Sequence, residues 1–420
     1  MKASIGGRGD GMTVEEIQGL YGPFSFPEKL LQQIWLRGDF DTRSAFTADG
    51  RRVEILHPGR WNLLGGPDFK DARLRIQNVV TTGDVELHLR ASDWRSHGHA
   101  SDPAYDRVVL HVVLFPGEER FTTGAGGREI PVLSLLPLLQ HDLEEYAADA
   151  AVERLANHPL TRAHEALAAL PPETLRAVLA EQAHERWRLK RHYARLRIER
   201  VGWIEACHQT AMEILGYRMN RAPMLAVATR WPLAEWERRT SQSPETWLNE
   251  LLAGGEGAWR WQVQGIRPAN QPRTRLLQYA RWTASCPQWP ERLAEVFRHW
   301  SESQSTFDGN LAAARKVFRL KALRETVGVD VCGETISGPR LDTLIGDGFW
   351  PLVAARGCVA EELAEAGWGF GFTGDVPDSW RRLLRQIDAI DGVRQPLTHG
   401  RVQGFLGWLL SEEKKQSLGN

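Results

Sequence analysis

The 420-residue sequence has only four cysteines, and no two of them form a Cys-x-x-Cys pair. Their scarcity and spacing argue against a disulfide framework or a zinc knuckle, and they suit a reducing compartment, so we expect a cytoplasmic protein. No apolar run approaches the roughly 20 residues of a membrane-spanning helix, so no membrane partner is expected. The glycine-rich residues 1–20 lack the apolar segment of a secretion signal, and we expect a disordered tail there.

The sequence also lacks an excess of charge of either sign. Its 52 lysines and arginines nearly balance 53 aspartates and glutamates, for a net charge of −1. Any binding to a polyanion must therefore come from a local basic patch. With 42% hydrophobic and 25% charged residues, the composition is that of a globular protein. The chain is too long for a single core, so two or more domains are expected.

The hydrophobic pattern divides the chain into an α/β domain, residues 21–137, and a mostly α-helical domain, residues 138–420. Breaks within the helical domain are expected near 254–272 and 332–339, where glycine and proline gather. The α/β domain is predicted to be a mixed sheet with the order helix, three strands, short helix, strand. The predicted segments are a helix at 27–36, strands at 52–57, 72–77, 82–90 and 108–115, a helical turn after Ser92, a glycine-rich turn at 122–127 and an edge strand at 130–136.

The second half of the chain shows helical periodicity and many of the 17 tryptophans. Tryptophans can stack on nucleic-acid bases, but large helical domains use them for packing, and we expect core positions. The predicted helices are at 138–151, 173–217, 232–239, 244–252, 273–283, 290–301 and 310–327.

Two short motifs on neighbouring predicted strands carry the strongest chemical signal. Asp68 precedes one strand in Gly66-Pro67-Asp68, and Glu86 and His88 share one face of the next strand. If these strands pair, the two carboxylates converge and repel each other unless a cation lies between them. Oxygen ligands of this kind favour Mg²⁺ or Mn²⁺. The alternative interpretation is a simple turn at Asp68 and a solvated strand face at Glu86 and His88.

The motifs and the element order resemble the PD-(D/E)xK nuclease superfamily, with its restriction-endonuclease-like αβββαβ core. The resemblance implies that Asp68 and Glu86 are metal ligands and catalytic residues of a Mg²⁺- or Mn²⁺-dependent nuclease, with Glu28 as a further acid from the upstream helix. His88 stands where the family has lysine. We expect His88 to assist the attacking water.

Further residues around the motif are candidates for substrate binding. Lys70 and Arg90 could supply the positive charge that the missing lysine would provide. His97 and His99 lie in the loop HGHASD, which superficially resembles the HxHxD loops of zinc hydrolases. We favour a polar turn whose histidines bond the backbone over an independent metal site. An intermediate reading places this loop beside Asp68 and Glu86, in contact with substrate phosphate.

The segment 184–200 is a predicted helix rich in arginine. Arg188, Arg191 and Arg195 are candidates for contacts with nucleic-acid phosphates. A solvated face balanced by acidic neighbours is the default interpretation.

Longer stretches, including GDVELHLRASDWRSHGHASDPAYDRVVLHVVLF, HPGRWNLLGGPDF, GIRPANQPRTRL and ISGPRLDTLI, resemble an uncharacterised bacterial family, domain of unknown function 2851. The resemblance implies an intracellular bacterial protein with an α/β front half and a helical back half, and it brings no activity. The sequence therefore leaves three hypotheses. The first is a metal-dependent phosphodiesterase that acts on nucleic acid, with DNA as the expected substrate. The others are a non-catalytic nucleic-acid-binding or scaffold protein with a decayed nuclease core, and a helical scaffold that docks protein partners.

Overall fold

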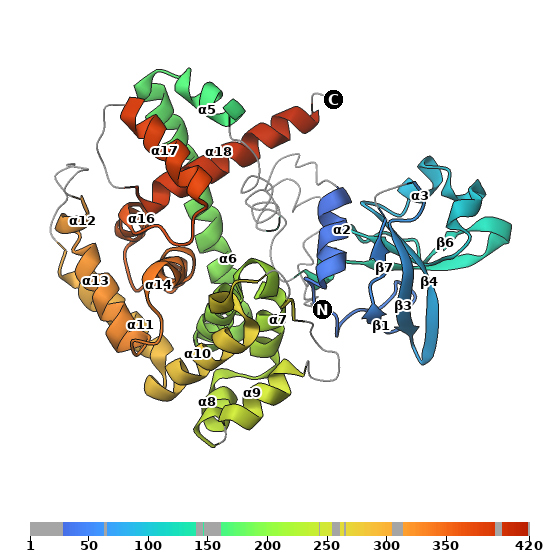
Figure 1. Cartoon of the computed structure of the whole chain (residues 1–420), viewed down its shortest axis with the longest axis horizontal. Coiled ribbons are helices and arrows are strands. Elements are labelled where there is room, and N and C mark those ends of the chain that lie inside the picture. The colour runs from blue at the N-terminus through green and yellow to red at the C-terminus, as the bar shows by residue number, and fades with distance from the viewer. Residues whose placement is uncertain are drawn as a thin grey trace, which may run out of the picture. The chain divides into compact units, whose positions relative to one another are not determined.

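A computed structural model describes residues 28–62, 65–139, 146, 161–242, 244–253, 261–263, 266–304, 314–390 and 397–418 (Figure 1). The chain divides into two compact units. The first unit comprises Met1–Gln140 with Lys414–Asn420, and the second comprises His141–Glu413. The tail expected at residues 1–20 and most of the helix expected at 138–151 lie outside the described residues.

The first unit is built on a seven-stranded mixed sheet. The strands lie in the order β1-β3-β4-β5-β7-β6, and β2 pairs with β3 away from this path. The bounds are β1 Val53–His57, β2 Arg60–Trp61, β3 Phe69–Ile76, β4 Val79–His88, β5 Val108–Val113, β6 Phe121–Thr123 and β7 Glu129–Ser134.

The pairing directions confirm the predicted fold class and element order. Strands β1, β3 and β4 form an antiparallel meander, and β5 runs parallel to β4 after a short helical connection. The residues Val108–Val113 are almost all buried, as expected of a central strand. One detail of the prediction is wrong. The strand expected at the edge is β7, which lies between β5 and β6, and the edge strand is β6 at the start of the predicted glycine-rich turn.

Helix α2, Glu28–Arg37, packs beside β4 (Figure 1). Its buried residues Leu30, Leu31, Ile34 and Trp35 follow helical spacing and form one apolar face. The Trp35 indole donates a hydrogen bond to the Pro58 carbonyl over 3.0 Å. This packing holds the start of the helix, and with it Glu28, near the end of the sheet that carries the acidic motif.

The connection from β4 to β5 contains one short α-helix, α3 Asp93–Ser96, and two 3-10 turns, His99–Ser101 and Pro103–Tyr105. Trp94 and Tyr105 are buried and pack with Val108 and Ile130. The Trp94 indole donates to the Thr123 carbonyl over 3.1 Å. The loop is therefore anchored to the sheet at both ends.

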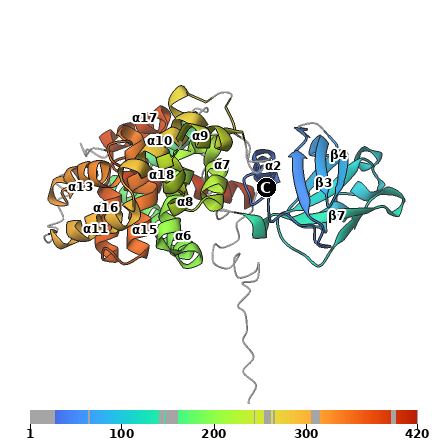
Figure 2. The same cartoon turned by 90° about the horizontal axis from the view of Figure 1, so that it is seen from below.

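The described part of the second unit is helical (Figure 2). Its longest helix, α6, changes direction at Gly202. The φ angle of Gly202 is 80°, which glycine adopts readily but which is strained for residues with a side chain. The α-helices are α5 Thr161–Ala168, α6 Pro172–Leu215, α7 Tyr217–Arg230, α8 Leu233–Gln242, α9 Pro244–Leu252, α10 Pro272–Ser285, α11 Trp289–Glu302, α12 Ala314–Val317, α13 Leu320–Thr326, α14 Gly338–Thr343, α15 Trp350–Ala355, α16 Glu361–Phe370, α17 Asp378–Ile390 and α18 His399–Leu418.

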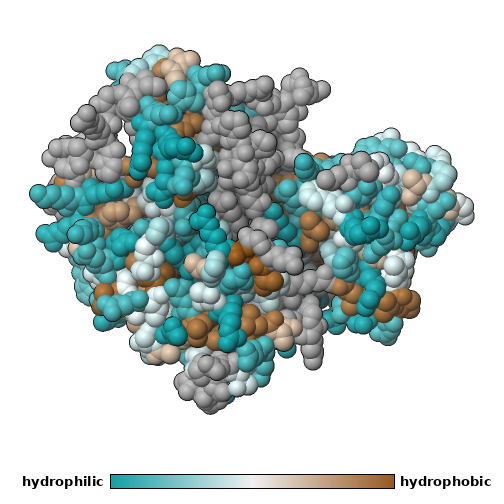
Figure 3. Space-filling view, viewed as in Figure 1, coloured by the Kyte–Doolittle hydropathy of each residue, from teal (hydrophilic) through white to brown (hydrophobic). Residues whose placement is uncertain are grey.

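Tryptophans fill the core of this unit, as predicted. Four of them are at most 1% exposed, namely Trp236, Trp282, Trp289 and Trp350. Such side chains stabilise helix packing through large buried areas and tilted ring contacts. The surface seen in Figure 3 is mostly hydrophilic, with scattered apolar groups. Among the described helices, none combines the length and apolar character needed to cross a membrane.

Candidate functional site

Asp68 and Glu86 meet because β3 and β4 pair in register at Phe69 and Val85. The Asp68 backbone N–H donates to Glu86 Oε2 over 2.9 Å. In return, the Leu87 backbone N–H donates to Asp68 Oδ2 over 3.1 Å. Each carboxylate is thus held by the backbone beside the other, and the predicted convergence of the two acids is confirmed.

Burial gives these two acids unusual acidities. Glu86 is only 5% exposed, so the alternative of a solvated strand face is wrong. Burial, reinforced by repulsion from Asp68, raises the pKa of Glu86 to about 9. Burial also raises the pKa of Asp68 to about 6, against the opposing effect of its hydrogen bonds to Gln32 and Leu87. In the described part of the chain, neither acid forms an ion pair with lysine or arginine.

Helix α2 contributes two groups to the same place. The Gln32 amide donates to Asp68 Oδ1 over 2.6 Å, and its carbonyl oxygen accepts from the Trp61 indole over 3.1 Å. Glu28, at the start of the helix, is close enough that its charge raises the pKa values of both Asp68 and Glu86. Burial raises the pKa of Glu28 itself. Three carboxyl groups therefore share one region, and a divalent cation would relieve their repulsion.

His88 begins a buried chain of hydrogen bonds. Its Nδ1 lies 2.9 Å from His111 Nε2, and His111 Nδ1 lies 2.7 Å from Thr122 Oγ1. All three side chains are at most 6% exposed. Burial, together with the neighbouring imidazoles, lowers the pKa of His88 to about 2. A neutral His88 cannot replace the positive charge of the lysine that the nuclease superfamily has at this position.

The loop histidines lie beside His88 and Glu86. His97 Nδ1 is 3.1 Å from His88 Nε2, and His99 Nε2 is 3.4 Å from Glu86 Oε1. The expectation that these imidazoles bond the backbone is wrong, since no such bond occurs in the described residues. The ring of His99 instead stacks on Tyr105, with 3.8 Å between centroids. The loop does border the Asp68 and Glu86 site, as the intermediate interpretation proposed.

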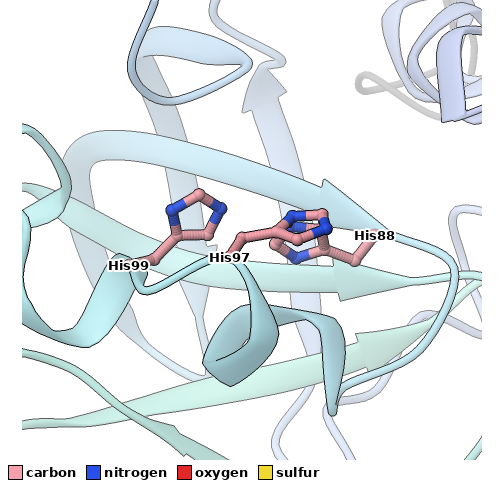
Figure 4. Close-up of side chains that lie close together, drawn as sticks. All are labelled: His88, His97 and His99. Atoms are coloured by element: carbon pink, nitrogen blue, oxygen red, sulfur yellow. The ribbon is translucent and has the colours of Figure 1, made fainter.

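Figure 4 shows His88 on its strand with His97 and His99 on the adjoining loop. One ligand nitrogen from each of the three residues lies within 4.8 Å of the others. The site thus offers two donor sets, a group of carboxylates and a group of imidazoles, with Glu86 belonging to both.

Lys70 and Arg90 are the candidates for a compensating positive charge. Lys70 is half-buried on β3, opposite Arg60 of β2. Arg90 is exposed just after β4, with its guanidinium 5.3 Å from the centre of the Phe115 ring. Neither forms an ion pair with the acids within the described residues. Their role in substrate binding remains a prediction.

The basic segment of α6 lies in the second unit, and its charges are largely balanced. Arg188 pairs with Glu185 over 3.0 Å, Arg195 lies 3.7 Å from Glu199, and Arg191 pairs with Glu361. These contacts fit the default interpretation of a solvated face. Other basic residues of α6, namely Arg186, Lys190 and Arg197, line a cavity of about 230 Å³.

Sequence reasoning assigned no role to Gln32, His111 or Thr122. Gln32 follows Glu28 by one helical turn, so the helical period could have identified it. His111 lies opposite Glu86 in the parallel pairing of β4 with β5, which only the register reveals. Thr122 lies on the three-residue strand β6, too short to show a strand pattern.

Comparison with known proteins identifies the family but no activity. A family model described as "Protein of unknown function (DUF2851)" matches residues 28–259, more than half of the chain. No match was found among curated proteins or among solved structures.

Proposed function

We propose that this chain, which belongs to the DUF2851 family, is a metal-dependent phosphodiesterase that cleaves nucleic acid. Asp68 and Glu86 would hold Mg²⁺ or Mn²⁺, and DNA is the expected substrate. We place the enzyme in the cytoplasm, in keeping with four free cysteines. The observation that carries the proposal is the convergence of the buried Glu86 carboxylate, which accepts from the Asp68 backbone N–H, and the half-buried Asp68 carboxylate, which accepts from the Leu87 backbone N–H.

The charge of the site supports a divalent cation. Burial raises the pKa values of Glu28, Asp68 and Glu86, and the charge of Glu28 raises those of Asp68 and Glu86 further. Neither Asp68 nor Glu86 has a lysine or arginine partner within the described residues. Burying such groups is costly unless protons or a cation neutralise them. A bound divalent ion would restore the ionised forms and provide the Lewis acid that phosphodiester hydrolysis needs. It would stabilise the negative charge that develops on the phosphate oxygens and lower the pKa of a bound water.

The neighbouring side chains have roles consistent with this chemistry. Glu28 would act as an outer acid of the metal site, and Gln32 orients Asp68 through its amide. His88 would position the attacking water through Nε2, which faces Glu86 Oε1 at 3.5 Å. Lys70, Arg90 and the loop histidines would contact the phosphate backbone, the commonest target of protein–nucleic-acid contacts.

Cleavage assays test this proposal. Fluorescent single-stranded DNA, duplex DNA and RNA are incubated with the purified protein and Mg²⁺, Mn²⁺ or EDTA. We expect cleavage that needs the ion and falls at least 100-fold in Asp68→Asn and Glu86→Gln. Asp71→Asn is the matched control, since Asp71 lies on β3 three residues after Asp68, but its side chain is 40% exposed and pairs with Arg60 and Arg107. Absence of cleavage with either ion, or equal cleavage by the Asp68 variant, contradicts the proposal.

The neutral state of His88 favours a second candidate, a non-catalytic nucleic-acid-binding protein on the same core. The missing lysine charge would then mark a site that has lost its activity. This candidate predicts DNA binding that weakens steeply with salt and does not depend on the metal. DNA binding that requires Mn²⁺ and is lost in Asp68→Asn would exclude it.

A further inference from the structure

The three histidines beside Glu86 have nitrogen atoms close enough together to bind one metal ion. We infer that His88, His97 and His99, with Glu86 Oε1, form a binding site for a zinc-type transition-metal ion. The site adds a second ion to the proposed catalytic centre, so it rests on the position of that centre but not on its activity.

The distances between the donor atoms fit a small tetrahedral ion. His88 Nε2 lies 3.1 Å from His97 Nδ1 and 3.5 Å from Glu86 Oε1, and His99 Nε2 lies 3.4 Å from the same oxygen. Ligands bound to Zn²⁺ at about 2.0–2.1 Å in a tetrahedron lie about 3.3 Å apart. Three edges of the group are therefore already close to the required length. The longest nitrogen–nitrogen separation, within 4.8 Å, can shorten because His97 is exposed and its ring can turn.

The hydrogen-bonding pattern is compatible with metal binding through His99 Nε2 and His88 Nε2. His99 Nε2 is buried and has no hydrogen-bond partner within the described residues, although it points at Glu86. If His88 Nδ1 donates its N–H to His111 and His111 Nδ1 donates its N–H to Thr122, the lone pair of His88 Nε2 can bind the metal in place of its 3.1 Å hydrogen bond with His97 Nδ1. Metal-binding histidines usually have such an outer partner, which fixes the ring and its tautomer.

The donor types separate the two ions. Imidazoles suit Zn²⁺, Co²⁺ and similar ions, whereas carboxylates suit Mg²⁺ and Mn²⁺. Glu86 turns Oε1 to the histidines and Oε2 to the Asp68 backbone, so one carboxylate can serve both places.

Co²⁺ provides a test that does not depend on activity, because tetrahedral Co²⁺ absorbs visible light strongly. The metal-free full chain is titrated with Co²⁺, and bound Co²⁺ is then displaced with Zn²⁺. We expect one strongly absorbing Co²⁺ per chain, displaced by one equivalent of Zn²⁺. His99→Phe, which keeps a ring against Tyr105, should weaken binding at least 100-fold, and Asp68→Asn should retain the absorption band.

A matched pair of variants tests the outer partner. Thr122→Val removes the hydroxyl that holds His111 and should weaken Co²⁺ binding about 10–100-fold. Thr123→Val, on the exposed side of the same strand, should leave it unchanged. Circular dichroism confirms that each variant is folded. Absence of the band in the wild type, its persistence in His99→Phe, or its loss in Asp68→Asn overturns the inference. The band without any nuclease activity would instead uphold this site and contradict the proposed function.

Discussion

Replacing Glu86 with glutamine should stabilise the metal-free protein while removing the proposed ion site. The carboxyl of Glu86 keeps its proton in the folded state up to a pKa of about 9, whereas the unfolded chain releases it near 4.5. The folded state therefore binds more protons between these values, and the stability due to this group falls as the pH rises through that window. At pH 7, which is 2.5 pH units above the pKa of 4.5 in the unfolded chain, this group lowers the free energy of unfolding by about 3 kcal/mol.

Glutamine resembles the protonated acid and does not titrate. Its carbonyl oxygen can accept the bond from the Asp68 backbone, and its amide can donate toward His99, so the fold keeps its contacts. In EDTA, Glu86→Gln should thus gain about 3 kcal/mol over the wild type between pH 4 and pH 7. Excess Mn²⁺ should stabilise the wild type but not the variant, because only binding to the folded state raises its stability.

The assay is urea unfolding of the full chain, with pulsed hydrogen exchange of β4 and β5 peptides to monitor the first unit separately. The control is Glu129→Gln on β7, since Glu129 is exposed. The difference in the free energy of unfolding between this variant and the wild type should not vary with pH. If Glu86→Gln is instead less stable than the wild type at pH 7 in EDTA, the ionised carboxylate stabilises the metal-free fold and the reasoning is refuted.

Two further predictions concern the helical unit. Burial lowers the pKa of His208 to about 4. Because the unfolded chain binds a proton at this residue from pH 6.5 downward, the free energy of unfolding should fall by on the order of 3 kcal/mol as the pH falls from 6.5 toward 4. The variant His208→Gln should therefore flatten the pH dependence of the urea midpoint. An unchanged slope in that variant would show that His208 is not the titrating group. Gly404→Ala would place a methyl group against the backbone oxygen of Leu179, at a cost of about 1–3 kcal/mol in urea unfolding. Gly369→Ala has open space around the new methyl group and should not destabilise α16; equal losses in the two variants would contradict the packing argument.

Much of the first unit could be predicted because local patterns determine it. Alternating side chains marked β3 and β4, and the apolar run of β5 marked a central strand. The convergence of Asp68 and Glu86 followed from the pairing of consecutive strands, which share a short connection.

The imidazole group could not be predicted in the same way. His111 reaches His88 through a parallel pairing that no local signal reveals, and Thr122 depends on the hairpin of β6 with β7. The helices from α14 onward were predicted only as part of a helical domain, without bounds, and the π-helical turns at Val327–Val331 and Leu344–Phe349 interrupt the helical period around α14.

The central claim is that Asp68 and Glu86 share a divalent ion. Diffraction from Mn²⁺-soaked crystals of the full chain, recorded on both sides of the manganese absorption edge, locates that ion directly. The account predicts an anomalous peak within bonding distance of both carboxylates, and its loss in Asp68→Asn crystals. A peak elsewhere in the protein, or none at saturating Mn²⁺, would contradict it.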